Sequence, residues 1–405
     1  MNPFNPQHLL KTSHLIETPA DLERFLPELR RADVIAVDTE SAAFYKYFHV
    51  VNLIQIATAD SAAIIDPQAL KDLSPLKALT AESSALWVMH GSGYDLRVLN
   101  RDFGIEFPRL FDTRLAAELL GMAELGLSAL CGLFLGFTLN KKLQRCDWSR
   151  RPLTSGMREY GLLDAICLIP VYHRLAEKLQ ELGRSGWVEE ECRYILETLE
   201  HDPAQPVESP FPYIIKGARD LSNRALCVLR EIWRFRDHLA RQMDRAPFML
   251  LHNQTLLELA RKSPQTMAGL SAVKGVPGSF LERHGHGLLD AVKAGVQSAP
   301  ITNLPLHDPR AQKYLSAWEG EIAKLLREAR NTHANRLQLP AAMLCCSDSL
   351  NALAHDRPTD LEQLIAHGGL RRWQADILGP DFLEILNRSS PQVSPKRPRR
   401  RRRKH

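Results

Sequence analysis

Two carboxylates stand two residues apart where a predicted strand ends. The run Val34–Val37 is short and apolar, and it leads directly into Asp38, Thr39 and Glu40. Side chains alternate along a strand, so Asp38 and Glu40 point to the same side. Neighbouring carboxylates repel each other, so this arrangement calls for a cationic partner.

Two further acidic positions follow later in the chain. Asp95 comes near the start of a predicted helix, after the strand and glycine-rich turn of LWVMHGSGYDL. Tyr160 and Asp164 are four residues apart in another predicted helix and therefore share one face of it. Asp164 adjoins the apolar run Ala165–Ile169, where a buried and unpaired carboxylate would be costly.

Divalent cations would explain all four carboxylates. Hard oxygen ligands bind Mg²⁺ or Mn²⁺, and two such ions about 3.5–4 Å apart stabilise the attacking and leaving oxygens of a phosphodiester. We therefore expect Asp38, Glu40, Asp95 and Asp164 to bind two divalent cations, Mg²⁺ or Mn²⁺. A free phenol has a pKa of roughly 10, so Tyr160 is expected to orient the attacking water rather than deprotonate it.

Each of these residues alone also fits an ordinary structural role. Asp38 and Glu40 could simply end a strand, and Asp95 could be a helix-start carboxylate stabilised by the helix dipole. Tyr160 and Asp164 could be a pair on the surface of a helix. Only the combination of all five predicts phosphodiester chemistry.

The motifs that carry these residues resemble those of the DEDD superfamily of 3′→5′ exonucleases, in the subgroup with a tyrosine in the last motif. Within that superfamily the chain looks most like the ribonuclease D family. The matching segments are VDTE, HGSGYDL and YGLLD, supported by LIQIA, IDP, FDT and DWSRRPL. The family often has alanines where this chain has Gly161–Leu163, but the spacing of Tyr160 and Asp164 is kept.

The resemblance implies a ribonuclease H-like α/β fold for the first 200 residues, a mixed sheet flanked by helices. It also implies hydrolysis of RNA from the 3′ end with release of 5′-mononucleotides, and tRNA precursors and other small stable RNAs as substrates. Two alternatives stay open: a DNA-directed 3′→5′ exonuclease with the same carboxylates, and a non-catalytic RNA-binding module. The non-catalytic module predicts a broken acidic set, whereas all four carboxylates and Tyr160 are present.

Aromatic and basic residues near these motifs could hold a single-stranded 3′ end. Phe44 follows the first motif and Tyr94 precedes Asp95, so either ring could stack on a terminal base. His90 is a candidate for substrate contact, although a packed histidine is the more common case. The segment 140–151 mixes basic residues with a tryptophan and predicts a phosphate track, or else a solvated connection. Its expected RNA contacts are Lys141, Lys142, Arg145, Trp148 and Arg151.

Strand and helix patterns alternate over the first 200 residues. The expected strands are 33–38, 51–58, 62–65 and 86–90. The expected helices are 21–29, 94–103, 114–120, 127–135 and 155–182, the last with Thr154 as its N-cap. The connection between the first two strands is too short for a crossover helix, which predicts an antiparallel pair.

The second half of the chain is expected to be helical and duplicated. Residues 202–212 hold four prolines and read as a linker. Beyond it, TLLELARKSP at 255–264 resembles SLNALAHDRP at 349–358. These repeats look like the helical-bundle HRDC domains found in ribonuclease D and certain helicases. The expected domains are an exonuclease domain at 1–203, HRDC-like domains at 213–298 and 309–389, and a disordered basic tail at 390–405.

The bulk composition narrows the class of protein. The 405 residues are 44% hydrophobic and 24% charged, without an apolar run long enough to span a membrane. Seven cysteines without a CxxC pair fit a cytoplasmic protein better than a disulfide scaffold, and no signal peptide is expected. Eight lysines and arginines lie in the tail from Lys396 to His405, so the net charge of +5 becomes −3 without it. Such a tail either attracts nucleic acid or serves only as a solvated, solubilising extension. A monomer is expected, because nothing in the sequence indicates an interface.

Overall fold

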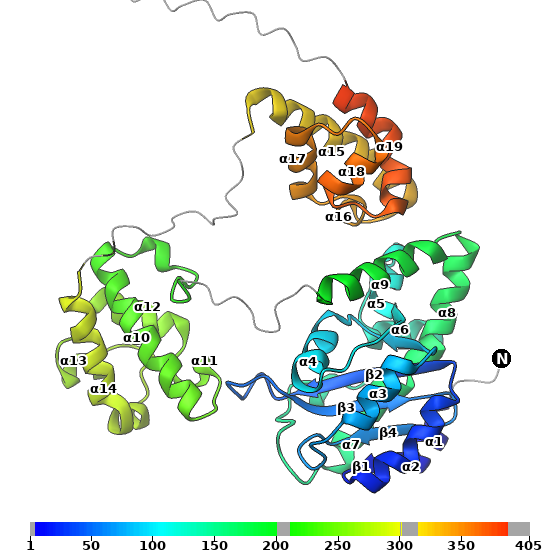
Figure 1. Ribbon diagram of the computed structural model, residues 1–405. Helices are drawn as coiled ribbons and strands as arrows, with labels where there is room; N and C mark the ends of the chain where they lie inside the picture. Colours follow the sequence, from blue (N-terminus) through cyan, green and yellow to red (C-terminus); the bar gives the residue numbers. More distant parts are fainter. Residues whose placement is uncertain (1–4, 201–210, 300, 302–314, 388–405) are drawn as a thin grey trace, which may run out of the picture. The chain divides into compact units, whose positions relative to one another are not determined.

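The computed structural model describes residues 5–200, 211–299, 301 and 315–387. It divides into two compact units. The first unit holds a sheet with its helices and the first helical repeat, and the second unit holds the second repeat (Figure 1). The predicted basic tail at 390–405 lies outside the described residues. No helix in the described ranges is both long and apolar enough to cross a membrane.

The sheet is mixed and has the strand order β1-β4-β3-β2-β5-β6. Strands β2 and β3 are antiparallel, as predicted, and so are β3 and β4, whereas the other neighbours are parallel. The register of β2 against β3 shifts between Glu40 and Ser41, a bulge next to the second carboxylate of the first motif. The strands are β1 (His14–Ile16), β2 (Val34–Ser41), β3 (Val51–Ala57), β4 (Ala62–Ile65), β5 (Leu86–Met89) and β6 (Leu110–Asp112).

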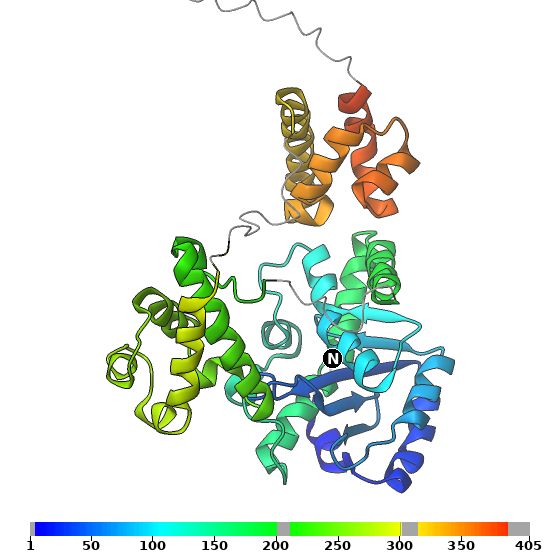
Figure 2. The same cartoon turned by 60° about the vertical axis from the view of Figure 1, so that its left-hand side comes forward.

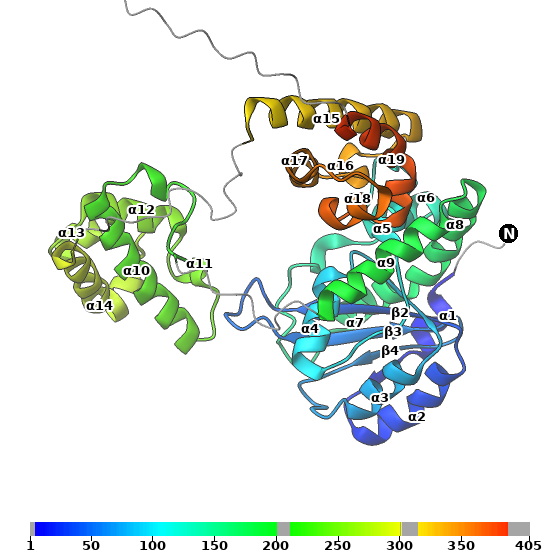
Figure 3. The same cartoon turned by 45° about the horizontal axis from the view of Figure 1, so that its top comes forward.

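Helices cover both faces of this sheet. Helix α7 packs across β2, β3 and β4, while α2 and α3 lie on the opposite face (Figures 1 and 3). Every residue of β3 is buried, as expected for a strand covered on both sides. The helices are α1 (Gln7–Thr12), α2 (Pro19–Arg30), α3 (Ser74–Glu82), α4 (Gly93–Phe103), α5 (Thr113–Leu119), α6 (Leu127–Leu135), α7 (Ser155–Ile166), α8 (Leu168–Glu181) and α9 (Ser185–Glu200), with a 3₁₀ turn at Lys141–Leu143.

Two sequence predictions about these elements are corrected. Strands β1 and β6 were not predicted, because three residues are too few to display the alternation of a strand. The predicted helix 155–182 is two helices, α7 and α8, which meet at Cys167. Pro170 lies in the first turn of α8, and a proline ring clashes with the carbonyl four residues earlier, so α7 ends before it. Thr154 caps α7 as predicted, accepting a hydrogen bond from the Met157 N–H.

The two helical repeats share one architecture, and Figure 2 shows each as its own bundle. Equivalent elements lie 94 residues apart, as the starts of α12 and α17 show. In both repeats a buried arginine of the long first helix donates to the carbonyl that follows the short second helix: Arg236 to Leu251 and Arg330 to Cys345, each at 2.9 Å. The first repeat contains α10 (Asn223–Gln242), α11 (Pro247–Leu250), α12 (Asn253–Lys262), α13 (Met267–Ser271) and α14 (Gly278–Gln297). The second contains α15 (Ala317–Leu337), α16 (Ala341–Leu344), α17 (Ser347–Asp356), α18 (Leu361–Gly368) and α19 (Arg372–Asn387).

Candidate active site

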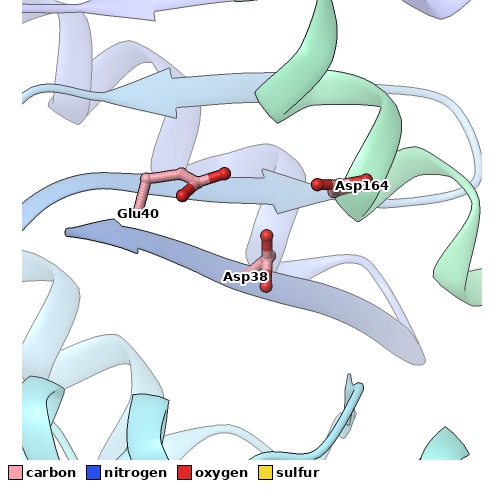
Figure 4. Close-up of side chains that lie close together, drawn as sticks. All are labelled: Asp38, Glu40 and Asp164. Atoms are coloured by element: carbon pink, nitrogen blue, oxygen red, sulfur yellow. The ribbon is translucent and has the colours of Figure 1, made fainter. Parts of the chain in front are cut away.

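Three of the predicted carboxylates meet where α7 crosses β2. Asp38 and Glu40 extend from the same side of β2, and Asp164 faces them from α7 (Figure 4). One carboxylate oxygen from each lies within 4.8 Å of the others. Two carboxylates of one strand and one of a helix therefore converge on a single point, and Asp38 and Glu40 share a side of the strand as their spacing predicts.

Asp95, in the first turn of α4, lies near this group but is not among the three carboxylates whose oxygens lie within 4.8 Å of one another. Its carboxylate accepts a hydrogen bond from the hydroxyl of Thr39, the residue between the two carboxylates of β2. Asp112 holds the turn before α4, because its carboxylate accepts the backbone N–H groups of Gly91 at 2.9 Å and Ser92 at 2.7 Å. Asp112 of the FDT motif therefore stabilises the turn before α4, a role that the residue types of the motif alone did not indicate.

Gly161 of α7 lies against the side chain of Gln55 on β3. A Cβ atom at this position would lie 3.0 Å from Nε2 of Gln55 on β3, tighter than an ordinary van der Waals contact. With an alanine at this position, the Gln55 side chain would have to shift by a few tenths of an ångström.

Burial makes the carboxylate cluster electrostatically costly. It raises the pKa of Asp38 well above its ordinary range, with further upward contributions from Asp95 and Asp164. Burial likewise raises the pKa of Glu40 to about 10, of Asp164 to about 7 and of Asp95 to about 6. No lysine or arginine forms a salt bridge with any of these four groups in the part of the chain that the structure describes. Crowded hard oxygen donors without a protein cation fit divalent metal ions.

Asp164→Asn is expected to stabilise the metal-free protein at pH 8. The pKa of Asp164 is raised from 3.8 to about 7, so the folded state binds this proton more tightly than the unfolded state. Stability is then lost as the pH rises between these two values. Removing the charge should raise the free energy of unfolding by on the order of 2 kcal/mol, which corresponds to a rise of roughly 5 °C in Tm. Differential scanning fluorimetry in EDTA measures this change.

The rise in Tm of Asp164→Asn over the wild type should be smaller at pH 5, because Asp164 of the folded wild type is protonated there. Adding Mn²⁺ should raise the Tm of the wild type more than that of Asp164→Asn, which lacks one ligand. Asp33→Asn is the matched control, because Asp33 is exposed just before the opposite end of β2. A lower Tm for Asp164→Asn in EDTA at pH 8 would contradict the proposed repulsion.

Tyr160 lies next to the cluster as a neutral phenol. Burial and the neighbouring carboxylates, Asp164 first among them, raise its pKa well above the ordinary value. Its hydrogen bond with Asp164 lowers the pKa of that carboxyl. The indole of Trp148 packs near its ring, with centroids 5.9 Å apart. A phenol in this setting donates a hydrogen bond and does not act as a base at neutral pH.

The structure corrects part of the predicted RNA track. Trp148 is fully buried, so the prediction that it contacts RNA is wrong, and the ring instead supports Tyr160. Arg151 is also unsuited to phosphate binding, because all five of its N–H donors are engaged. Its acceptors are both carboxylate oxygens of Asp66 and the carbonyls of Asn52, Trp148 and Arg150.

The other predicted contacts remain predictions. Lys142 and Arg145 are exposed, and the side chain of Lys141 lies outside the described residues. Phe44 and Tyr94 are 46% and 41% exposed, which leaves both rings available for stacking.

His90 has a structural setting. Burial lowers its pKa to about 4, so the imidazole is neutral. Its Nδ1 lies 3.0 Å from the Thr113 hydroxyl, which donates its own proton to the Met89 carbonyl. His90 must therefore donate from Nδ1. The packed role is the one that these contacts support.

Comparisons with known proteins agree with this geometry. A family model described as 3'-5' exonuclease matches residues 13–180, and the HRDC domain model matches 225–292 and 319–386. Ribonuclease D of Shewanella sp. (strain ANA-3) is 31% identical over 83% of this chain and 86% of its own length. Ribonuclease D of Zymomonas mobilis is 30% identical over 92% of this chain and 93% of its own length.

Solved structures give the same result. A protein from Bifidobacterium adolescentis matches with a TM-score of 0.78 and 25% identity, over 93% of this chain and 97% of that one. Escherichia coli RNase D, described as an exoribonuclease involved in structured RNA processing, matches with a TM-score of 0.63 and 25% identity, over 92% and 98%.

Fold, acidic cluster and matches together define a 3′→5′ exonuclease with helical accessory domains. The chain belongs to the ribonuclease D family of exoribonucleases. The resemblance in the sequence motifs, the mixed α/β fold and the duplication of the helical domain are confirmed.

Proposed function

We propose that this exoribonuclease shortens the 3′ ends of tRNA precursors and other small stable RNAs, one nucleotide at a time. The observation that carries the proposal is the convergence of Asp38, Glu40 and Asp164 within 4.8 Å, beside Tyr160. The ribonuclease D relatives match over nearly their whole length, and the E. coli member is described as processing structured RNA. These similarities support the substrate class.

Asp38, Glu40, Asp95 and Asp164 would hold two divalent cations, Mg²⁺ or Mn²⁺. When bound, such ions supply charge neutralisation and activate a water for attack on phosphorus. The protein's own contribution is to fix the four carboxylates rigidly: two on β2, one in the first turn of α4 and one on α7. Because the donors are already gathered by the fold, little reorganisation is required when the substrate arrives.

Tyr160 would orient the attacking water. Its neutral hydroxyl donates a hydrogen bond, and the packing of Trp148 limits where that hydroxyl points. Attack forms a bond between the water oxygen and phosphorus, and the bond from phosphorus to the 3′ oxygen of the preceding nucleotide breaks. The products are a nucleoside 5′-monophosphate and an RNA one nucleotide shorter with a free 3′ hydroxyl.

RNA labelled at its 5′ end and carrying a single-stranded 3′ overhang tests this proposal. With Mg²⁺ or Mn²⁺, the expected product is a ladder that shortens by single nucleotides, and EDTA should abolish it. A DNA strand of the same sequence should be shortened more slowly, because it lacks the 2′-hydroxyl that distinguishes RNA. Equal digestion of the DNA would favour the DNA-directed alternative. Cuts inside the strand would contradict the exonuclease mechanism.

A further inference from the structure

The loop of residues 42–50, between β2 and β3, is held by helix α4 on one flank. The side chain of Arg101 donates to the carbonyl of His49, and the carboxylate of Asp102 accepts the N–H of Val51 at 2.9 Å. Helix α4 also carries Asp95. The loop therefore contacts the same helix that supplies one of the four carboxylates.

The first helical repeat holds the same loop through a second set of contacts. The carboxylate of Asp244 accepts the N–H of Phe48 and pairs with the ammonium of Lys46, both at 3.1 Å. The N–H of Ala246 donates to the carbonyl of Tyr45 at 2.9 Å. The hydroxyl of Tyr47 donates to the carboxylate of Asp237 at 3.1 Å. Four consecutive loop residues, 45–48, thus have partners in or just after helix α10.

An aromatic surface lies beside these contacts. The ring of Phe44, 46% exposed, packs against Phe248 of α11 with centroids 5.0 Å apart and a tilt of 59°. Phe44 is four residues beyond Glu40, so their Cα atoms are at most about 14 Å apart along the chain. Phe48 is 47% exposed and has the guanidinium of Arg241 6.0 Å from its ring. Exposed aromatic rings beside a basic group are typical of single-stranded nucleic acid sites.

The second repeat provides an internal comparison. At the positions 94 residues later, Asn331 replaces Asp237, Gln338 replaces Asp244 and Ala342 replaces Phe248. The backbone is the same at the key position, because Asp244 and Gln338 both have positive φ, 43° and 56°. The helical fold therefore requires neither the carboxylate nor the aromatic ring. Another role must explain why the first repeat has them, and the loop beside the active site provides one.

We propose that Phe44 and Phe248 together form a stacking site for a base of the single-stranded RNA, a few nucleotides upstream of the 3′ end, and that Asp244 positions Phe44 from the first HRDC domain. This inference rests on the proposed function. RNA is the occupant that the surroundings favour, because Phe44 lies within a few residues of the carboxylates and the guanidinium of Arg241 lies beside the ring of Phe48 in the same loop. Arg245, three residues before Phe248, is also exposed. The first HRDC domain then contributes directly to substrate binding at the nuclease site.

The second repeat also supplies fold-compatible test substitutions, Phe248→Ala and Asp244→Gln. The assay compares kcat/KM for a single-stranded RNA octamer with that for a dinucleotide, which is too short to reach the stacking site. Each substitution should lower the octamer-to-dinucleotide ratio about tenfold, mostly through a higher KM for the octamer. Phe248→Tyr should restore the ratio, because its ring still stacks.

Asp290→Gln is the matched control, because Asp290 is exposed on α14 of the same repeat, and its ratio should equal that of the wild type. Octamer binding in EDTA, followed by fluorescence anisotropy, should weaken in Phe248→Ala independently of catalysis. An unchanged ratio and unchanged binding in Phe248→Ala would overturn the inference, as would an equal loss on both substrates. A wild type that degrades neither substrate would instead refute the proposed function.

Discussion

Asp38→Asn is expected to stop RNA shortening while RNA binding persists. Asp38 lies at the centre of the acidic group: Asp95 and Asp164 both raise its pKa, and its carboxylate lies within 4.8 Å of Glu40 and Asp164. Asparagine keeps the shape but removes the charge that a divalent cation requires, so turnover should fall on the order of 10³-fold or more. The measurement is single-turnover shortening of 5′-labelled RNA in Mn²⁺, with binding measured separately.

Asp33→Asn provides the comparison for this experiment. Asp33 is an exposed acid that directly precedes the same strand, five residues from Asp38, and should tolerate the change. Circular dichroism would establish that both variants fold. If Asp38→Asn kept more than a tenth of the wild-type rate, a different set of side chains would have to perform the reaction.

Tyr160→Phe should lower kcat on the order of 10²-fold with little change in KM. The substitution keeps the ring that packs beside Trp148 and removes only the hydroxyl that bonds to Asp164. The raised pKa of Tyr160 excludes a role as a base near neutrality. In saturating Mn²⁺, which keeps Asp164 ionised, the loss should therefore be the same from pH 6 to pH 8. Stopped assays at saturating RNA across this range measure it.

Tyr172→Phe is the matched control on the adjacent helix α8. The ring of Tyr172 packs against Phe111, 4.8 Å between centroids, and that contact survives the loss of the hydroxyl. Metal binding by Tyr160→Phe, followed as the Tm rise with Mn²⁺, should remain. Full activity of Tyr160→Phe would remove this hydroxyl from the mechanism. A loss of kcat that varies steeply with pH would indicate proton transfer instead of orientation.

Much of the acidic site is readable in the sequence because its geometry is local. Asp38 and Glu40 share a strand face through an alternation of two residues, and Tyr160 and Asp164 share a helix face through a spacing of four. The antiparallel pairing of β2 and β3 follows from their short connection. These rules involve neighbours along the chain, so no knowledge of distant contacts is needed.

Predictions about exposure were less successful. Trp148 lies in a segment rich in basic residues, and nothing in that segment shows that its indole is buried beside Tyr160. Arg151 reads as a phosphate ligand until Asp66, 85 residues away, engages it. Whether a side chain faces solvent depends on what the rest of the chain places over it.

The sequence by itself determined the chemical class of this protein, because its motifs resemble those of the DEDD exonucleases. Local periodicity also placed Asp38 with Glu40 on one strand face and Tyr160 with Asp164 on one helix face. The sequence also determined the duplication of the helical domain. Only the tertiary structure decided that Asp164 of α7 comes within 4.8 Å of Asp38 and Glu40, because α7 and β2 are far apart in the chain. The tertiary structure alone also places Asp244 and Phe248 against the loop after Glu40, although roughly two hundred residues of sequence separate them from that loop. The physical reason is that packing and long-range hydrogen bonds join residues whose separation in sequence carries no periodic signal.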